Sequence, residues 1–342
     1  MKAVPFFEHG PVGVLEYREI YPEPVPGKGE VIIDVKYCGV NHLDIWTRQG
    51  LMPKKIRLPH VCGCDIVGNV RSGSQHFIAG DRVMVYPGAY CAACRFCRAG
   101  RQNLCAKFAI IGGMSSYDGG YAEQVCVPER NVIGLPTSIG DEEAAALAVS
   151  YLTSWNMLST AGAGKGKTVL VYGAAGGLGM ATVQLAKALG ATVITTVSGK
   201  SKQDFAGRLG ADRVIDRSSQ NVAETVEKIT GGIGVDIVID HVGASTWSTS
   251  IAVLKQGGRM AVSGMTSGNE ATVPVRTFYT KQITMTGALL GTKPQLAELL
   301  GFVTRKKIRP VIDSILPLEK AAEAHAKMEA GRQMGKILLK CS

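Results

Sequence analysis

Four cysteines lie close together in the segment CAACRFCRAGRQNLC, which spans residues 91–105. Gaps of two residues let neighbouring thiolates turn toward one tetrahedral ion, and four sulfur ligands leave no coordination position open. The spacing therefore predicts one structural Zn²⁺ per chain, while an iron–sulfur cluster and, in a thermophile, disulfide pairing stay open as alternatives. The predicted ligands are Cys91, Cys94, Cys97 and Cys105.

A glycine-rich turn, GAAGGLG at residues 173–179, follows the apolar run TVLVY and precedes a helical segment. A strand, a glycine turn and a helix in this order are typical of a dinucleotide site, where helix N–H groups face the pyrophosphate. We expect Gly176 to let the backbone approach the phosphates and Gly179 to let the helix lie close to the strand. The alternative is an ordinary tight turn. The predicted cofactor-binding residues of the turn are Ala174, Gly176, Gly177, Leu178 and Gly179.

The next apolar run, ATVITTV at residues 191–197, bears on the choice of cofactor. An NAD site usually has an acidic residue about 20 residues beyond the turn, where it bonds the ribose hydroxyls. Val197 stands at that place, and no acid follows before Asp204. A hydroxyl and two cations follow the run and suit a ribose phosphate, so NADP(H) is predicted; the alternative is that the lysines only lie on an exposed loop. These residues are Ser198, Lys200 and Lys202.

Strand and helix patterns alternate from about residue 143, whereas the preceding residues are rich in Gly, Pro and short β-type runs. Continuous apolar strands separated by helices predict the α/β class, with a doubly wound parallel sheet covered on both faces and a second, β-rich domain. After residue 309 the pattern returns to short strands around one Ala-rich helix.

Composition narrows the class of protein. The 342 residues suit two domains, and Lys plus Arg (38) exceed Asp plus Glu (28), which gives a formal net charge of +10. The basic runs are short and lack interleaved aromatic residues, so no nucleic-acid partner is predicted. No secretory signal is visible, and no apolar stretch reaches the roughly 20 residues that cross a bilayer, so a cytoplasmic protein with no membrane partner is predicted.

Motifs along nearly the whole chain resemble those of the medium-chain dehydrogenase/reductase superfamily, in particular its zinc-type alcohol dehydrogenase and quinone oxidoreductase branches. They include RLPHVCGCDIVG, AGDRV, the cysteine segment, DGGYAE, the glycine turn, DHVG and the closing GK. The resemblance implies a GroES-like domain at residues 1–148, completed by 310–342, and a Rossmann NADP(H)-binding domain at 149–309. It also implies a homodimer or a homotetramer.

The resemblance allows the superfamily's catalytic zinc ligands to be compared residue by residue. It places Asn41, Cys64 and Val149 where zinc enzymes of the family have Cys, His and Cys, and Leu43 and Trp46 where they have the proton-relay Thr and His. Valine cannot bind a metal, so an active site without zinc is predicted. A rearranged metal site stays open as the alternative, and its candidate ligands are Cys38, Cys62, Cys64, Asp65, His42 and His60.

Without a Lewis acid, an already activated acceptor is the predicted substrate, so we expect NADPH-dependent reduction of a quinone, an enone or a related carbonyl compound. Asn41 is the predicted hydrogen-bond donor to the substrate oxygen. The resemblance places Thr153 beside the nicotinamide, and His42 and Lys336 at the pyrophosphate; plain structural roles are the alternatives for these three. The rival functions are an NADP(H)-dependent alcohol or aldehyde dehydrogenase with a nonstandard active-site zinc, and a non-enzymatic NADPH-binding protein.

Overall fold

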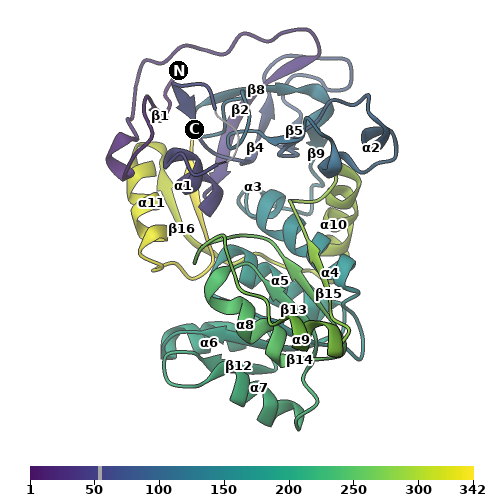
Figure 1. The fold of residues 1–342 in the computed structure, drawn as a ribbon. Helices are drawn as coiled ribbons and strands as arrows, with labels where there is room; N and C mark the ends of the chain where they lie inside the picture. Colours follow the sequence, from purple (N-terminus) through teal and green to yellow (C-terminus); the bar gives the residue numbers. More distant parts are fainter. Residues whose placement is uncertain (53–55) are drawn as a thin grey trace. The chain divides into compact units, whose positions relative to one another are not determined.

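The computed structural model describes residues 1–52 and 56–342 and divides into two compact units (Figure 1). The first unit joins Met1–Leu152 to Leu290–Ser342, and the second is the continuous segment Thr153–Leu289. Each unit contains a cluster of buried apolar side chains of its own. Each therefore has the core that a separate domain requires.

Six parallel strands form the sheet of the second unit, in the order β12-β11-β10-β13-β14-β15. The strand order reverses between β10 and β13, which lie side by side at the centre, and this is the arrangement of a doubly wound Rossmann sheet. The predicted fold class is confirmed. The strands are β10 (Thr168–Val171), β11 (Thr192–Val197), β12 (Arg213–Asp216), β13 (Val235–Asp240), β14 (Leu254–Val262) and β15 (Thr284–Gly287). The helices of this segment are α4 (Leu152–Ala161), α5 (Gly177–Ala188), α6 (Lys200–Arg208), α7 (Val222–Thr230), α8 (Ala244–Val253) and α9 (Val275–Thr280).

The central strands of this sheet are apolar along their length. Val169, Leu170 and Val171 of β10 are all 0% exposed, so both faces of the strand are covered. Helices α5, α6 and α8 pack against the sheet. Continuous apolar runs, rather than alternating ones, are what a sheet buried on both faces requires.

A seven-stranded sheet forms the centre of the first unit, in the order β16-β17-β2-β4-β5-β9, with β8 also pairing with β2. Its strands are β2 (Glu30–Gly39), β4 (Asp65–Val70), β5 (Arg82–Val85), β8 (Gln124–Pro128), β9 (Val132–Gly134), β16 (Ile312–Pro317) and β17 (Lys336–Lys340). Two smaller sheets pair β1 (Pro5–Phe6) with β3 (His60–Val61) and β6 (Gly88–Ala89) with β7 (Ala109–Ile110). The helices of this unit are α1 (His42–Arg48), α2 (Arg95–Arg98), α3 (Asp141–Ala144), α10 (Lys293–Lys306) and α11 (Ala321–Glu329).

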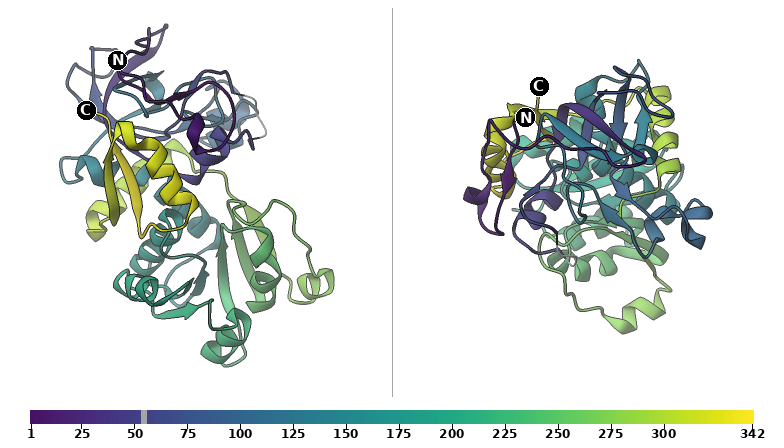
Figure 2. Two further views of the ribbon diagram at one scale, coloured as in Figure 1. Left: turned by 90° about the vertical axis from the view of Figure 1, so that its left-hand side faces the viewer. Right: turned by 90° about the horizontal axis from the view of Figure 1, so that it is seen from above.

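The C-terminal strands complete this second sheet. Strand β17 pairs antiparallel with β2, with Leu339 opposite Cys38, and runs parallel to β16. Figure 2 shows the yellow C-terminal segment beside the purple N-terminal strands, with the two termini near each other. As a result Lys336, at the start of β17, lies beside Val40, which is 296 residues away along the chain.

The second boundary between the units falls at Leu290 rather than after residue 309, where the sequence predicted it. Helix α10 follows the last strand of the parallel sheet, so chain order alone assigns it to that sheet. In the structure it belongs to the first unit, because Lys293 Nζ donates to Arg130 O at 2.7 Å and Tyr86 Oη donates to Gly291 O at 2.7 Å. The first boundary, at Leu152, lies within four residues of the predicted one.

In the described part of the chain, every helix is either too short or too polar to span a membrane.

Candidate functional site

The four cysteines of the segment 91–105 come together as their spacing predicts. The Sγ–Sγ distances are 3.5 Å for Cys94–Cys97, 3.5 Å for Cys91–Cys105 and 3.8 Å for Cys91–Cys97. A tetrahedral zinc with Zn–S bonds of about 2.3 Å separates its sulfurs by about 3.8 Å, so the donor set fits this ion. Among residues 1–52 and 56–342, this is the only group of three or more side chains with metal-ligand chemistry that lie close enough to share an ion.

Backbone N–H groups of the same lobe point at the sulfurs. The N–H of Cys94 donates to Cys91 Sγ and the N–H of Lys107 donates to Cys105 Sγ, each at 3.4 Å. Hydrogen bonds from the backbone of Ala93 and Cys94 lower the pKa of Cys91 to about 6. Such donors favour thiolates, which are the form that binds a metal.

The glycine turn has the geometry that a pyrophosphate site needs. Gly176 precedes helix α5, and a Cβ added to it would meet its nearest atom, Gly173 O, only at 3.6 Å. A Cβ on Gly179 would instead lie 2.2 Å from Gly173 O, so this helix approaches the strand as closely as only glycine allows. The first helical bond of α5 runs from Met180 N to Gly176 O. The N–H groups of residues 177–179 therefore remain for a ligand.

The end of β11 carries the residues predicted to choose the cofactor. Val197 is 2% exposed, and the following Lys200 is exposed and pairs with Asp204 at 3.0 Å. Sequence reasoning missed one exposed cation at this place, Arg217. Its backbone N–H donates to Val197 O at 2.9 Å, so Arg217 lies beside the end of β11. The signal for it was available, since carboxyl ends of neighbouring parallel strands meet at one edge of a sheet, and Arg217 directly follows β12.

An acid lies at the same edge. The carboxylate of Asp216 accepts hydrogen bonds from the N–H of Gly199 at 3.1 Å and from Gln203 Nε2 at 2.8 Å. Hydrogen bonds from Ser218 are the main cause that lowers the pKa of Asp216 to about 2. The acid thus holds the loop after β11 in place, while Lys202, Lys200 and Arg217 supply the positive charge around it.

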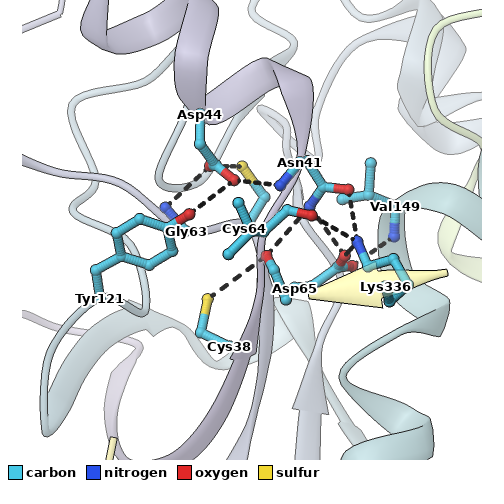
Figure 3. A network of polar contacts seen from close by, with 11 residues as sticks. Cys38, Asn41, Asp44, Gly63, Cys64, Asp65, Tyr121, Val149 and Lys336 are labelled. Atoms are coloured by element: carbon cyan, nitrogen blue, oxygen red, sulfur yellow. Dashed lines mark hydrogen bonds and ion pairs between the residues drawn. The ribbon is translucent and has the colours of Figure 1, made fainter. Parts of the chain in front are cut away.

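A buried ion pair lies where the resemblance places the catalytic zinc (Figure 3). Lys336 Nζ donates to Asp65 Oδ2 and to Asn41 Oδ1, each at 2.8 Å, and to Val40 O at 3.0 Å. The two charged side chains are 1% and 0% exposed. The N–H of Val149 donates to Asp65 Oδ1 at 2.6 Å. Positions that match zinc ligands in the family are therefore tied together by an ammonium and a carboxylate of the chain itself.

Two of the predicted roles differ from what this network allows. Asn41 Nδ2 donates to Asp65 Oδ2 at 2.9 Å and to Gly39 O at 3.3 Å, so both amide hydrogens are used within the unit and none is left for a substrate oxygen. An ammonium has three protons, and those of Lys336 meet three oxygens, so it does not face a pyrophosphate. Asn41 and Lys336 instead hold Asp65.

Asp44 lies at the centre of a second set of contacts, also drawn in Figure 3. Its carboxylate accepts hydrogen bonds from the N–H of Asn41 at 2.7 Å, the N–H of Gly63 at 3.1 Å, Tyr121 Oη at 3.2 Å and Cys64 Sγ at 3.6 Å. Burial, as the largest cause, raises the pKa of Asp44 to about 6. Four donors satisfy the carboxylate, so its role is to orient α1 and the segment that contains Cys64.

The chain of contacts continues from Tyr121 to the C-terminal helix. Tyr121 Oη lies 3.0 Å from His325 Nε2, and His325 Nδ1 lies 3.3 Å from Arg48 Nη1. Arginine can only donate, so His325 accepts at Nδ1 and carries its proton at Nε2. Burial lowers the pKa of His325 to about 3, which keeps the ring neutral. Arg48 also pairs with Glu329, so α1 and α11 are joined through buried polar groups.

The side chains weighed for a rearranged metal site have separate partners. The thiols of Cys62 and Cys64 lie 3.6 Å from different oxygens of Asp44, the main-chain O and Oδ1. His60 Nδ1 lies 3.3 Å from Asp118 Oδ1. Cys38 is fully buried in the apolar core of the unit. These directions do not converge on one point.

Thr153 and His42 are the remaining predicted residues. Thr153, in α4, is 4% exposed. The neighbouring Ser154 Oγ donates to Leu178 O at 3.2 Å, which brings α4 against the start of α5. His42 begins α1, where its ring centroid lies 6.1 Å from that of Trp46.

Comparison with known proteins identifies the family. The alcohol dehydrogenase GroES-like domain matches residues 27–137, and the zinc-binding dehydrogenase domain matches residues 177–305. An alcohol dehydrogenase of Geobacillus stearothermophilus is 31% identical over 331 residues, which cover 95% of this chain and 96% of the relative. This chain belongs to the medium-chain dehydrogenase/reductase superfamily. The resemblance predicted from the motifs and the GroES-like domain are thereby confirmed, and the chain is an oxidoreductase of this superfamily.

Relatives in the superfamily have two kinds of name. A quinone oxidoreductase of Rattus norvegicus is 30% identical over 350 residues, which cover 99% of this chain and 97% of the relative. A crystal structure of an NAD-dependent alcohol dehydrogenase superposes with a TM-score of 0.94 at 38% identity and covers 100% of both chains. The superfamily therefore fixes the fold and the general chemistry, while the substrate depends on the residues of this chain.

Proposed function

We propose that this chain is an NADPH-dependent oxidoreductase that reduces a quinone, an enone or a related carbonyl compound without a catalytic zinc. The observation that carries the proposal is the buried ion pair of Lys336 and Asp65, which hydrogen-bonds Asn41 and the N–H of Val149, two of the three positions where the resemblance places zinc ligands. A site built around an internal ammonium offers no open coordination position to polarise an alcohol. A conjugated acceptor, such as a quinone or an enone, depends less on a Lewis acid for hydride transfer, because hydrogen bonds can stabilise the charge on its oxygen.

Two parts of the chain would hold the cofactor. The bound cofactor supplies the hydride. The free N–H groups at the start of α5 suit its pyrophosphate, as the open space at Gly176 supports. The hydroxyl of Thr153 is the donor we propose for the nicotinamide side of the site, since the neighbouring Ser154 contacts Leu178 at the start of α5. A cytoplasmic location and a homodimer or homotetramer are part of the same proposal.

One experiment separates this function from its two rivals. We expect the purified protein to oxidise NADPH with quinones or enones, to contain one zinc per chain, and to keep its turnover when a mild chelator removes loosely held metal. A second zinc, together with chelator-sensitive turnover of primary or secondary alcohols, would support an alcohol dehydrogenase, as several relatives are named. Cofactor binding without turnover of any quinone, enone or aldehyde would support the non-enzymatic protein.

The choice of NADPH has a separate test. Substituting Arg217→Ala should weaken NADPH binding by about ten-fold, because a guanidinium that meets a phosphate makes a charge-assisted hydrogen bond, and should leave NADH binding almost unchanged. Arg213→Ala is the matched control, since Arg213 is an exposed cation at the other end of the same strand. Dissociation constants from the quenching of protein fluorescence give the comparison. Tighter binding of NADH than of NADPH by the parent protein would contradict the proposed specificity.

A further inference from the structure

An isoleucine near the N-terminus has its side chain almost entirely in solvent. Ile20 is 93% exposed, more than any other bulky apolar side chain of residues 1–52 and 56–342, and Val25 is 88% exposed. Both lie in residues 19–27, which contain no helix or strand and which we call the N-terminal arm. A single exposed apolar residue is common on a protein surface, so the setting of Ile20 decides whether it has a role.

Hydrogen bonds fix the backbone on both sides of Ile20. The N–H of Arg18 donates to Ala3 O at 2.9 Å. The N–H of Tyr21 donates to Met1 O at 2.9 Å, and the ammonium of Met1 donates back to Tyr21 O at 3.0 Å. A side chain that an ordered backbone presents loses less conformational freedom when it binds a partner. The N-terminal arm therefore offers Ile20 as a preformed contact.

The N-terminal arm is also negatively charged. Glu19 and Glu23 are exposed, and residues 19–27 contain no lysine or arginine. An exposed apolar side chain flanked by carboxylates suits a surface that has an apolar hollow and cations beside it. A surface with these two properties would be the complement of the arm.

A groove with an apolar lining lies in the same unit, between α3 and the end of α10 (Figure 1). It holds about 190 Å³ of space, part of which is open to solvent. An apolar side chain that entered this α3–α10 groove would exchange contact with water for contact with other apolar side chains. The apolar residues that line the groove are Ile139, Leu147, Val303, Ile308 and Pro310.

Cations lie beside this groove. The sequence RKKIR, at residues 305–309, covers the end of α10 and the residues after it, and residues 299–312 contain no acid. Glu143, in α3, also lines the groove and pairs with Arg309 at 2.6 Å. Three further exposed cations leave the rim of the groove with an excess of positive charge. They are Arg305, Lys306 and Lys307.

We propose that Ile20 of one copy of this chain inserts into the α3–α10 groove of a second copy, with Glu19 and Glu23 beside the cations of its rim. Ile20 is exposed in its own chain, so the groove of another molecule must receive it. The arm and the groove have opposite charges, which guide the approach and disfavour contacts between like surfaces. If each arm meets the groove of the other copy, the contact forms twice and the assembly closes, as a two-fold axis requires. The contact does not depend on the proposed reaction.

Removing the apolar side chain is the first test. We expect Ile20→Ser to raise the dissociation constant of the assembly by about ten-fold, because a branched apolar side chain no longer fills the groove. Ile233→Ser is the matched control, since Ile233 is a 71% exposed isoleucine of the second unit, and it should associate like the parent. Sedimentation equilibrium gives the dissociation constants.

Charge reversal is the second test. Glu19→Lys/Glu23→Lys should also weaken the association, and adding Arg305→Glu/Lys306→Glu in the same chain should restore it, because opposite charges then face each other again. Glu224→Lys/Glu227→Lys, on exposed residues of α7, changes the net charge by the same amount as the first variant and should have no effect. Recovery in the four-fold variant is a result that damage to the arm alone would not produce.

A cross-link locates the contact. With the photoreactive p-benzoylphenylalanine in place of Ile20, a mixture of ¹⁵N-labelled and unlabelled protein should give cross-links between a labelled and an unlabelled chain, at peptides that contain residues 303–309. Cross-links within one chain or to another surface would overturn the proposal. A monomeric parent protein, or equal association of the parent and Ile20→Ser, would equally overturn it. The quinone and cofactor tests above are unaffected by any of these results, so the contact and the proposed function fail separately.

Discussion

Replacing Lys336 with methionine is expected to lower the free energy of unfolding by about 3–5 kcal/mol, because it leaves a buried carboxylate without its cation. Lys336 Nζ lies 2.8 Å from Asp65 Oδ2, with both side chains at most 1% exposed. Methionine retains most of the aliphatic stem, so the loss reports the charge and its hydrogen bonds rather than the packing. Urea unfolding followed by circular dichroism measures the change.

Two further variants make this result specific. Arg71→Met breaks a pair of the same chemistry, with Asp34 at 2.7 Å, but its side chains are 46% and 43% exposed, so the expected loss is under about 1 kcal/mol. The double variant Lys336→Met/Asp65→Asn buries no charge and should recover part of the lost stability. A loss in Lys336→Met no larger than that in Arg71→Met would contradict the view that this ion pair organises the site.

The parts of the site that sequence could predict are local in the chain. The glycine turn was recognisable because a strand, the turn and a helix follow one another within about twenty residues, as the motif requires. The 2.2 Å approach of a Gly179 Cβ to Gly173 O bears out the reason given for that glycine. The cysteine cluster was equally recognisable, since only two residues separate Cys91 from Cys94 and Cys94 from Cys97. In both cases the spacing itself determines the geometry.

The polar network around Asp65 was not predictable in this way. Lys336 and Asp65 are 271 residues apart, and they meet because β2 pairs with both β17 and β4. Tyr121 and His325, at a separation of 204 residues, meet for the same kind of reason. Lysine side chains are mostly exposed, so from the sequence alone Lys336 would be expected at the surface. Its burial could be learned only from the sheet that surrounds it.

A role expected of a single residue differs from the structure where the atoms needed for that role are hydrogen-bonded to a neighbouring residue. Asn41 has the right chemistry to donate to a substrate oxygen, but Asp65 and Gly39 O take both of its amide hydrogens. Arg217 was not predicted because it follows β12, whereas the expected cofactor-selecting residues follow β11, the strand after the glycine turn. Neighbouring strands of a parallel sheet end at one edge, so the residues after β12 lie beside those after β11.

Loss of the ion from the four-cysteine lobe is the other large effect we expect. Between residues 91 and 107 the regular structure consists of α2, with four residues, and a single turn at Gln102–Leu104. Elements this short cannot bury enough apolar surface to be stable alone, so the binding free energy of the metal would be the folding free energy of the lobe. Cys97→Ser removes one ligand and should release the zinc.

Limited digestion with trypsin measures the consequence. Four exposed basic residues lie in the lobe, at Arg95, Arg98, Arg101 and Lys107. In the metal-bound protein we expect the peptide bonds that follow these four residues to resist trypsin, because a protease cleaves an extended segment. In Cys97→Ser they should be cut early, while metal analysis shows that the zinc has gone.

Cys126→Ser is the matched control for this prediction. Cys126 lies outside the cluster, where its Sγ contacts Glu30 Oε2 at 3.5 Å, so the substitution should change neither the zinc content nor the digestion pattern. Equal resistance of Cys97→Ser and Cys126→Ser would show that the lobe folds without an ion. If chelation of the parent protein reproduced the pattern of Cys97→Ser, the metal and not the lost thiol would be the cause. In that case the structure of the four-cysteine lobe depends on a bound metal ion. The site around Asp65 differs, because there the positive charge comes from Lys336.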